Sequence, residues 1–409
     1  MRICLLCNRG NMYSGGQGVY IHYLAKEYRL MGHEVDIIVG PPYPLIADGA
    51  RVHKIPNLNL FESQKNFLSK DKPFQVFKPL NLYEVAATRM GMFPEMFTFG
   101  IRSYIKLKEL MAKNKFDIIH DNQTLAYGNL LMKSLKTPIV ATVHHPLSID
   151  RKSDLTHTKS FKAKWGRIMF YPFFMQRIVT KRMDRVITVS NSSAQNAKQA
   201  FKIPQSKLRV VYNGVDTDNF RVRTDVKKET NSLIVVTNTR DRNKGIIYLL
   251  QALTQMRGKV KLTIVDEKPP LNDYAPGLVK EYGIEDMVTF TGRLSHDDVA
   301  RKYAAAQIAV TPSVYEGFGL PAAEAMACGV PVVGTTAGAL PEVIENNVTG
   351  ILVPPRSPQA LVGTIQTLLD DPDLRQKMGA AGVERVRHNF TWQKSAKATI
   401  DVYNEVINC

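Results

Sequence analysis

The first forty residues alternate apolar runs, glycines and an amphipathic segment in an order that few folds can accommodate. A short apolar run at 2–7 predicts a buried strand, and the glycine-rich loop NRGNMYSGGQG follows it. Apolar residues then recur at helical spacing until Gly32, which is typical of a helix terminus, and 34–39 is strand-like again. A strand, a glycine loop, a helix and a second strand make a βαβ unit, so we expect a parallel sheet covered by helices.

Further apolar runs of strand length follow in two series, with a charged segment at 221–231 between them as a linker. The first series lies at 117–120, 138–143, 185–189 and 208–212, and the second at 233–237, 261–265, 287–290, 308–311, 331–334 and 351–353. A chain of 409 residues is long enough for two or more cores. We therefore expect an α/β protein with two successive open-sheet domains.

The composition argues against several broad classes of protein. Hydrophobic residues at 44% and charged residues at 22% are near the averages of soluble globular proteins, so a largely disordered chain is not expected. No uncharged apolar run approaches about 18 residues, which argues against a membrane-spanning helix. Four cysteines do not make a disulfide scaffold, and the N-terminal apolar run is too short for a secretory signal. We expect a cytoplasmic protein.

The charge is unevenly distributed. The chain carries 54 basic and 37 acidic residues, and the resulting net charge of +17 favours anionic partners. The stretch 151–185 holds ten Lys or Arg against Asp154 and Asp184, a local +8, interleaved with aromatics such as Trp165 and Phe170. This mixture suits an anionic membrane surface. A basic helix whose aromatic residues lie in the core fits equally well, so peripheral membrane association is one of two interpretations.

The segment 312–344, PSVYEGFGLPAAEAMACGVPVVGTTAGALPEVI, is the most informative part of the chain for function. A strand leads into a glycine-bearing loop, and Pro321 is typical of the first residue of a helix. The backbone N–H groups at 319–322 then point out of the carboxyl edge of the sheet, which suits a phosphate or a sugar hydroxyl. Glu316 on the loop and Glu324, expected in the first helical turn, can face one crevice and accept hydroxyls. Taken alone, Glu324 is more simply interpreted as a helix-dipole carboxylate.

Together these elements closely resemble the signature of the retaining glycosyltransferases of family 4, E-x7-E within EGFGLPxxEAMACGxPVV. The resemblance extends over nearly the whole chain, because SGGQGVYIHYLAKEYRLMGHEV, VVYNGVDTDNF and the closing FTW occur in the family's order. It implies the GT-B fold: two facing Rossmann-like domains with parallel sheets, and a C-terminal helix crossing back to the first domain. The implied boundaries are 1–212 for the acceptor-side domain, 213–387 for the donor-side domain and 388–409 for the segment that packs back.

Position by position, the resemblance implies catalytic roles for His144, Glu316 and Lys244. The residues that would bind the donor are Gly15, Gly16, Arg240, Lys244, Arg293, Leu294, Phe318, Gly319, Leu320 and Glu324. Glu324 would hold the ribose of a nucleotide-sugar, and Glu316 would contact the transferred sugar. His145 is the alternative to His144, because both histidines follow the strand in ATVHHP.

One site departs from the family's pattern of Gly-Arg, four residues and Lys-Gly, in which the two cations neutralise the diphosphate. Here the run is TNTRDRNKG: Lys244-Gly245 fits, whereas the first glycine is absent and Arg240 precedes Lys244 by only four positions. Either Arg240 keeps the role in a shorter loop or Arg242 replaces it. The run VDEKPPLND also replaces a glycine-rich segment that often follows the next strand in the family.

The chemistry implied by the resemblance follows from charge. Fixed cations and helix N–H donors would stabilise the nucleoside diphosphate as the anomeric bond breaks. The leaving phosphate would help to take the acceptor's proton, so no separate nucleophile and base are needed. No Asp-x-Asp stands where a metal-dependent transferase binds Mg²⁺, so we expect neither a metal nor a cofactor. Cys4 and Cys7 have zinc-knuckle spacing but lie in the first strand without a second pair, which indicates core residues.

Three other functions fit the sequence less well. An NAD-dependent oxidoreductase needs G-x-G-x-x-G and an acidic residue after the second strand, where Pro41 and Pro42 stand instead. A sugar-nucleotide epimerase uses the same fold, but the E-x7-E segment favours transfer. A basic nucleic-acid-binding protein would use the positive charge, but no nucleic-acid module is recognisable.

The donor base, the sugar and the acceptor stay open, and a lipid-linked acceptor in cell-envelope glycan or glycolipid synthesis fits the basic stretch.

Overall fold

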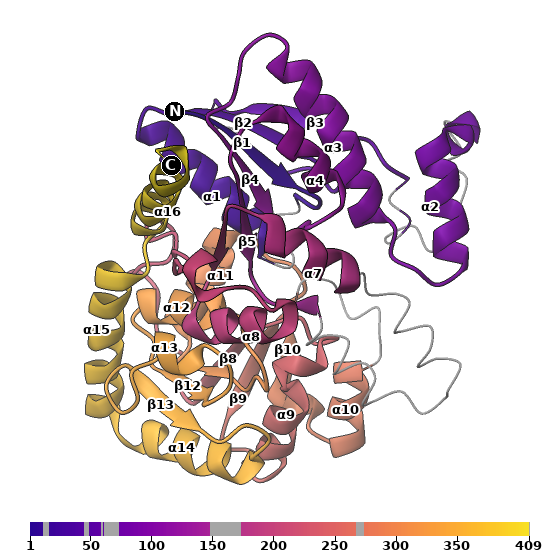
Figure 1. Ribbon diagram of the computed structural model, residues 1–409. Coiled ribbons are helices and arrows are strands. Elements are labelled where there is room, and N and C mark those ends of the chain that lie inside the picture. Colours follow the sequence, from indigo (N-terminus) through magenta and orange to yellow (C-terminus); the bar gives the residue numbers. More distant parts are fainter. Residues whose placement is uncertain are drawn as a thin grey trace. The chain divides into compact units, whose positions relative to one another are not determined.

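The computed structural model describes residues 1–10, 16–44, 49–58, 60, 73–147, 173–266 and 274–408. The chain divides into two compact units, and Figure 1 follows it through both from indigo to yellow. The first unit comprises Met1–Val189, Ser193–Val211 and the residues from Ala396 on, and the second comprises Ser190–Ser192 and Tyr212–Ser395. Each unit is built on a parallel sheet of its own.

The first unit contains a seven-stranded sheet in the order β3-β2-β1-β4-β5-β6-β7. Its strands are β1 (Arg2–Cys7), β2 (Glu34–Val39), β3 (Arg51–Lys54), β4 (Ile118–Asn122), β5 (Ile139–Val143), β6 (Arg185–Thr188) and β7 (Leu208–Val210). Every residue of β4 and β5 is buried, as expected for central strands that are covered on both faces. In the register of these two strands Asn122 pairs with Thr142, so their carboxyl ends lie side by side.

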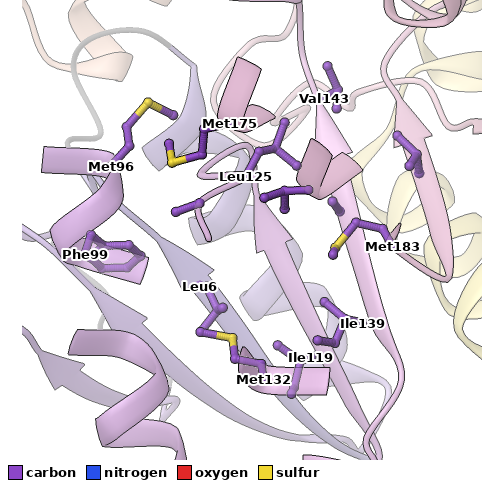
Figure 2. Close-up of a cluster of buried hydrophobic side chains, with 14 of the residues drawn as sticks. Leu6, Met96, Phe99, Ile119, Leu125, Met132, Ile139, Val143, Met175 and Met183 are labelled. Atoms are coloured by element: carbon purple, nitrogen blue, oxygen red, sulfur yellow. The ribbon is translucent and has the colours of Figure 1, made fainter. Parts of the chain in front are cut away.

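Helices surround this first sheet. They are α1 (Gln17–Leu30), α2 (Pro79–Arg89), α3 (Glu95–Met111), α4 (Gly128–Met132), α7 (Phe173–Arg182) and α8 (Asn191–Phe201). Figure 2 shows how their apolar side chains meet those of the strands in one cluster: Leu6 and Ile119 come from the sheet, Phe99 from α3 and Met175 from α7. This core holds the carboxyl ends of β1, β4 and β5 in place.

The second unit contains a six-stranded sheet in the order β10-β9-β8-β11-β12-β13. Its strands are β8 (Ser232–Val236), β9 (Lys261–Val265), β10 (Val288–Phe290), β11 (Ile308–Thr311), β12 (Val332–Thr335) and β13 (Gly350–Val353). Its helices are α9 (Ile246–Thr254), α10 (Tyr274–Tyr282), α11 (His296–Ala305), α12 (Leu320–Ala327), α13 (Leu340–Val343), α14 (Pro358–Asp370) and α15 (Pro372–Asn389). Buried Leu, Ile, Val and Met side chains from the strands and from α9, α14 and α15 form its core.

The last helix, α16 (Trp392–Ile407), begins in the second unit and belongs to the first from Ala396 on. Within the first unit, the Tyr403 hydroxyl pairs with the His120 ring of β4 and lies 3.1 Å from the Tyr28 hydroxyl of α1. Figure 1 accordingly shows the yellow end of α16 beside the indigo helix α1. The return of the C-terminal helix to the first unit is confirmed.

The segment 388–409, which was expected to pack back as a whole, is divided between the units. Phe390 stays with the second unit, where its carbonyl accepts a hydrogen bond from the Val215 N–H at 2.8 Å. Its ring lies 5.6 Å from the Phe318 ring, between centroids. These contacts keep the chain before Ala396 in the second unit.

The predicted strands are confirmed, with bounds that differ from the expected ones by at most two residues. Cys4 and Cys7 are fully buried in β1, as expected of core residues. The elements β3, α2 and α3 had no clear pattern in the sequence. In the described part of the chain, no helix is both long enough and apolar enough to cross a membrane. The basic and aromatic stretch 151–185 lies outside the described residues up to position 172.

Candidate active site

The predicted donor-site residues of the second unit lie at the carboxyl edge of its sheet. The loop with Lys244 follows β8, Arg293 and Leu294 follow β10, and the loop 312–319 follows β11. Strands β8 and β11 are neighbours in the sheet but not in the sequence, so the strand order reverses between them. A reversal of this kind leaves a crevice at the carboxyl ends of the two strands, which is the usual ligand site of open α/β sheets.

Lys244 and Glu316 meet at this reversal. The Nζ atom of Lys244 lies 2.8 Å from Oε1 and 2.9 Å from Oε2 of Glu316. Ser313 Oγ donates a further hydrogen bond of 2.9 Å to Oε1. The Glu316 side chain is 7% exposed and the Lys244 side chain 27%, so the cation is the more accessible member of the pair.

Backbone contacts join the two loops that carry this pair. The Val314 N–H donates to the Asn243 carbonyl at 2.8 Å. Gly245, directly after Lys244, has a φ of +65°, and a Cβ atom there would lie 2.1 Å from the Pro312 carbonyl oxygen. Only glycine permits this φ and this approach together. The Lys-Gly pair seen in the sequence therefore has a structural cause, because the glycine lets the lysine loop close on the glutamate loop.

The start of α12 presents unbonded donors. Gly319 is the N-cap of the helix, with a φ of +101°. The backbone N–H groups of Phe318, Gly319 and Leu320 donate to no group in the described part of the chain. Such a helix start binds anions. The expectation of a free N–H at Ala322 is wrong, because this group donates to the Gly319 carbonyl at 3.0 Å. Likewise the helix begins at Leu320, and Pro321 is its second residue.

Glu324 is the fifth residue of α12, so the expectation that it lies in the first helical turn is wrong. The helix-dipole interpretation loses its support with this, since the effect is confined to the first turn. The carboxylate is half-buried and has no hydrogen-bond or ion-pair partner among the described residues. Desolvation, together with the charge of Asp216, raises the pKa of Glu324 to about 7. A desolvated carboxylate without a partner is suited to accept hydrogen bonds from a ligand.

The two candidate arginines differ in their surroundings. The Arg242 guanidinium lies over the Tyr274 ring, 5.1 Å from its centroid. The exposed Arg240 side chain has no partner in the described part of the chain. This difference favours Arg240 as the residue that meets a diphosphate, a role that stays a prediction. Arg293 is exposed and Leu294 is half-buried, directly before α11, and their contact with a base is likewise a prediction.

The first unit has a comparable site at the carboxyl edge of its own sheet. The strand order reverses between β1 and β4. Gly16, which follows β1, is the N-cap of α1 with a φ of +69°. His144 directly follows β5, the neighbour of β4, so both residues lie at the same edge. Gly15 lies outside the described residues.

Two residues that were not singled out in the sequence hold His144. Asn122, at the end of β4, has its Oδ1 2.7 Å from Nε2 of the His144 ring. The next residue, Gln123, accepts the His144 N–H through Oε1 and donates from Nε2 to the His145 carbonyl at 2.9 Å. The one available signal was that both stand two or three residues beyond the predicted strand 117–120. Uncharged amides have no spacing pattern that would mark them.

Burial sets the charge of His144. Desolvation, followed by the charges of His145 and His120, lowers the pKa of His144 to about 3, so the imidazole is neutral near pH 7. The Tyr20 ring lies against it edge-on, with the two centroids 4.9 Å apart. A neutral imidazole has one donor nitrogen and one acceptor nitrogen. It therefore suits a sugar hydroxyl better than a phosphate.

Known proteins are similar to this chain over its whole length. Residues 216–385 match the family model of glycosyl transferases group 1, and residues 14–219 match that of glycosyltransferase family 4. An MMP alpha-(1->4)-mannosyltransferase from Mycolicibacterium hassiacum is 35% identical over 411 residues, which cover 100% of this chain and 98% of the relative.

Solved structures show the same fold at lower sequence identity. A sucrose-phosphate synthase from Thermosynechococcus elongatus is similar with a TM-score of 0.76 and 24% identity, over 100% of both chains. HepE from Anabaena in complex with UDP-glucose has a TM-score of 0.72 and 20% identity, over 99% of this chain and 100% of its own. The family matches, the 35% identical relative and the two parallel-sheet units lead to one conclusion: the chain belongs to the glycosyltransferases of group 1 and family 4, with the GT-B fold.

Proposed function

We propose that this glycosyltransferase moves a hexose from a nucleotide-sugar to a hydroxyl acceptor with retention of the anomeric configuration. The observation that carries the proposal is the cluster at the reversal between β8 and β11. It combines the Lys244–Glu316 pair with the unbonded N–H groups at 318–320, and the unpartnered Glu324 lies on the same helix, α12. Donors for phosphate oxygens and acceptors for sugar hydroxyls are thus offered by one unit, and a nucleotide-sugar carries both kinds of group.

The proposed reaction breaks the bond between the anomeric carbon and the phosphate oxygen. Negative charge grows on the leaving nucleoside diphosphate, and Lys244 and the N–H groups at the start of α12 stabilise it, each such donor contributing about 3 kcal/mol. Glu316 orients Lys244 and accepts a hydrogen bond from a hydroxyl of the transferred sugar. The acceptor oxygen bonds to the anomeric carbon on the face that the phosphate leaves. Its proton passes to the leaving phosphate, so charge and atoms balance.

The relatives guide the choice of donor. HepE was solved with UDP-glucose, and the relative from Mycolicibacterium hassiacum is a mannosyltransferase by name. We therefore propose a nucleoside diphosphate hexose as donor, with glucose and mannose as the first sugars to test. We further propose that the reaction needs no metal ion, because a lysine and backbone donors already face the leaving group.

A donor screen tests the proposed function. Release of nucleoside diphosphate is followed with UDP-, GDP- and ADP-linked glucose and mannose, with simple methyl hexosides as acceptors and with or without EDTA. We expect one base to be preferred, EDTA to have no effect, and the anomeric proton of the product to show the configuration of the donor. Inverted product contradicts retention, and loss of activity in EDTA contradicts metal independence. If none of the tested donors gives nucleoside diphosphate, the transferase proposal is contradicted.

We also propose that the protein binds anionic membranes peripherally, so that a lipid-linked acceptor is within reach. The proposal rests on the basic and aromatic composition of 151–185. In the described end of this stretch, α7 exposes Phe174 to 72% and Ile178 to 39%. These two apolar side chains are four residues apart on one helix face, and Lys181 is exposed beside them. Exposed apolar residues next to cations are typical of helices that lie at a headgroup interface.

Vesicle co-sedimentation tests this association. We expect recovery with anionic but not with neutral vesicles, because each cation at the surface contributes about 1 kcal/mol. One variant replaces Lys159, Lys162, Lys164 and Arg167 with Gln, and a second carries Phe174→Ser and Ile178→Ser. Both should lower recovery. The matched control is Leu30→Ser on α1, where an equally exposed apolar residue (73%) lies outside the stretch. Equal recovery with both lipids, or unchanged recovery of both variants, contradicts the proposal without affecting the transferase assignment.

A further inference from the structure

The side-chain amide of Asn122 is held on both of its ends. Its Nδ2 donates to the backbone carbonyl of Gln17, the first residue of α1, at 3.0 Å. The same nitrogen lies 3.6 Å from the sulfur of Cys7, at the end of β1. Its Oδ1 faces Nε2 of His144 at 2.7 Å. One buried amide therefore links the start of α1, which follows the glycine-rich loop, to the histidine at the end of β5.

These contacts determine which nitrogen of His144 carries the proton. The Gln17 carbonyl can only accept a hydrogen bond, so the amide must turn its NH₂ group towards it and its oxygen towards His144. An amide oxygen has no hydrogen to offer, so Nε2 of His144 must be the donor. Since the imidazole is neutral, Nδ1 is left without a proton and is an acceptor. No group in the described part of the chain bonds to Nδ1.

We infer that Asn122 is a positioning residue, which fixes the Nε2–H tautomer of His144 so that Nδ1 accepts a hydrogen bond from a substrate hydroxyl. The inference rests on the proposed transfer of a sugar, whose hydroxyls are the donors that a bare imidazole nitrogen recognises. It also assigns different tasks to two neighbours. Gln123 holds the backbone of His144, through its N–H, whereas Asn122 holds the ring and its proton.

Burial keeps the His144 ring neutral near pH 7, because desolvation lowers its pKa to about 3. The titratable side chains that face it within the described residues are Tyr20, which packs against it, and His145 and His120, whose charges act on it. Burial keeps Tyr20 protonated, because its pKa is raised, and lowers the pKa of His120 to about 3. His120 is therefore neutral near pH 7. A carboxylate in place of the Asn122 amide would be a new charge and would raise the pKa of His144.

Long-range ¹H–¹⁵N NMR spectra of the full-length protein, labelled at histidine, test the inference without any substrate. Loss of one set of signals in His144→Gln assigns the ring among the nine histidines. We expect the wild-type signals to show a protonated Nε2 and an unprotonated Nδ1. These signals should not change between pH 6 and 8. Asn122→Ala should increase the fraction of His144 rings that carry the proton on Nδ1. Asn122→Asp should keep the tautomer and raise the pKa of the ring, which a titration extended below pH 6 measures.

The matched control is Gln123→Ala, which removes the bond to the His144 backbone and leaves the ring contact intact. It should leave the tautomer unchanged. A wild-type ring that is charged or protonated at Nδ1 overturns the inference, as does an unchanged tautomer in folded Asn122→Ala. If Asn122→Ala does not fold, Asn122→Asp decides, because the pKa of its His144 ring must lie above that of the wild type. Once a donor is known, kcat of Asn122→Asp should fall about tenfold per pH unit below the new pKa, whereas wild-type kcat stays flat. Absence of turnover in the wild type would refute the proposed function but not the tautomer.

Discussion

Replacing Glu316 or Lys244 with Ala should lower turnover at least ~100-fold in a protein that still folds. Lys244 faces the charge of the leaving diphosphate, and loss of one such fixed donor typically costs this much. Glu316 acts partly through the lysine, because both of its oxygens lie within 2.9 Å of Nζ. Without Glu316, the ammonium group is no longer held in one position. The measurement is kcat with the preferred donor, after thermal unfolding has shown that each variant is folded.

The ion pair between these residues predicts how the double variant behaves. Side chains in direct contact give non-additive effects, so Glu316→Ala with Lys244→Ala should cost less than the two single losses multiplied together. The matched control is Arg301→Gln, which removes exposed ion pairs with Asp225 and Asp297 in the same unit. It should leave kcat unchanged, because exposed ion pairs contribute little. Wild-type turnover in either folded single variant would mean that the E-x7-E motif has been wrongly assigned.

Replacing Glu324 with Ala should weaken binding of the free nucleoside diphosphate by about 5- to 150-fold. Two ribose hydroxyls lose their acceptor, and unpaired polar groups of this kind cost about 1–3 kcal/mol. Isothermal titration calorimetry measures the effect directly. Glu384→Ala on α15 is the control, since that glutamate is exposed and lies within an i,i+3 ion pair with Arg387. Affinity equal to that of the wild type would refute the ribose assignment.

The same carboxylate predicts a pH dependence of binding. In the ligand-free protein, desolvation and Asp216 raise the pKa of Glu324 to about 7. Hydroxyl donors stabilise the ionised form, so the bound protein has a lower pKa at this residue and binding releases protons below pH 7. The affinity should therefore rise with pH up to about 7 and level off above it. Below pH 7 the rise should be at most about tenfold per pH unit. The dependence should disappear in Glu324→Ala. If the affinity of the wild type decreases as the pH is raised from 6 to 7, this account is contradicted.

Much of the site could be predicted because its elements are local. Lys244-Gly245 and Glu316 stand in loops directly after buried strands, and buried parallel strands are recognisable as short apolar runs. Helix bounds were less certain. The start of α12 was expected at Pro321, but Gly319 in a left-handed conformation lets the helix begin at Leu320, which moves Glu324 out of the first turn.

Asn122 and Gln123 show what could not be predicted. Neither residue is charged, and their partners are 21 to 115 positions away, at Cys7, Gln17, His144 and His145. In the sequence, an amide side chain in an exposed loop cannot be distinguished from one in a buried hydrogen-bond network. Its function depends on which carbonyl and which imidazole the folded chain brings within about 3 Å.

The order of the residues was enough to predict the two α/β units, the strands that form their sheets, and the glycine and carboxylate positions that identify the family. Which of these residues meet depends on how the folded chain packs. The strand orders reverse between β1 and β4 and between β8 and β11, and these reversals bring Asn122 to Gln17 and Lys244 to Glu316. The physical reason is that apolar periodicity is a property of each segment, whereas strand order follows from the packing of all segments together.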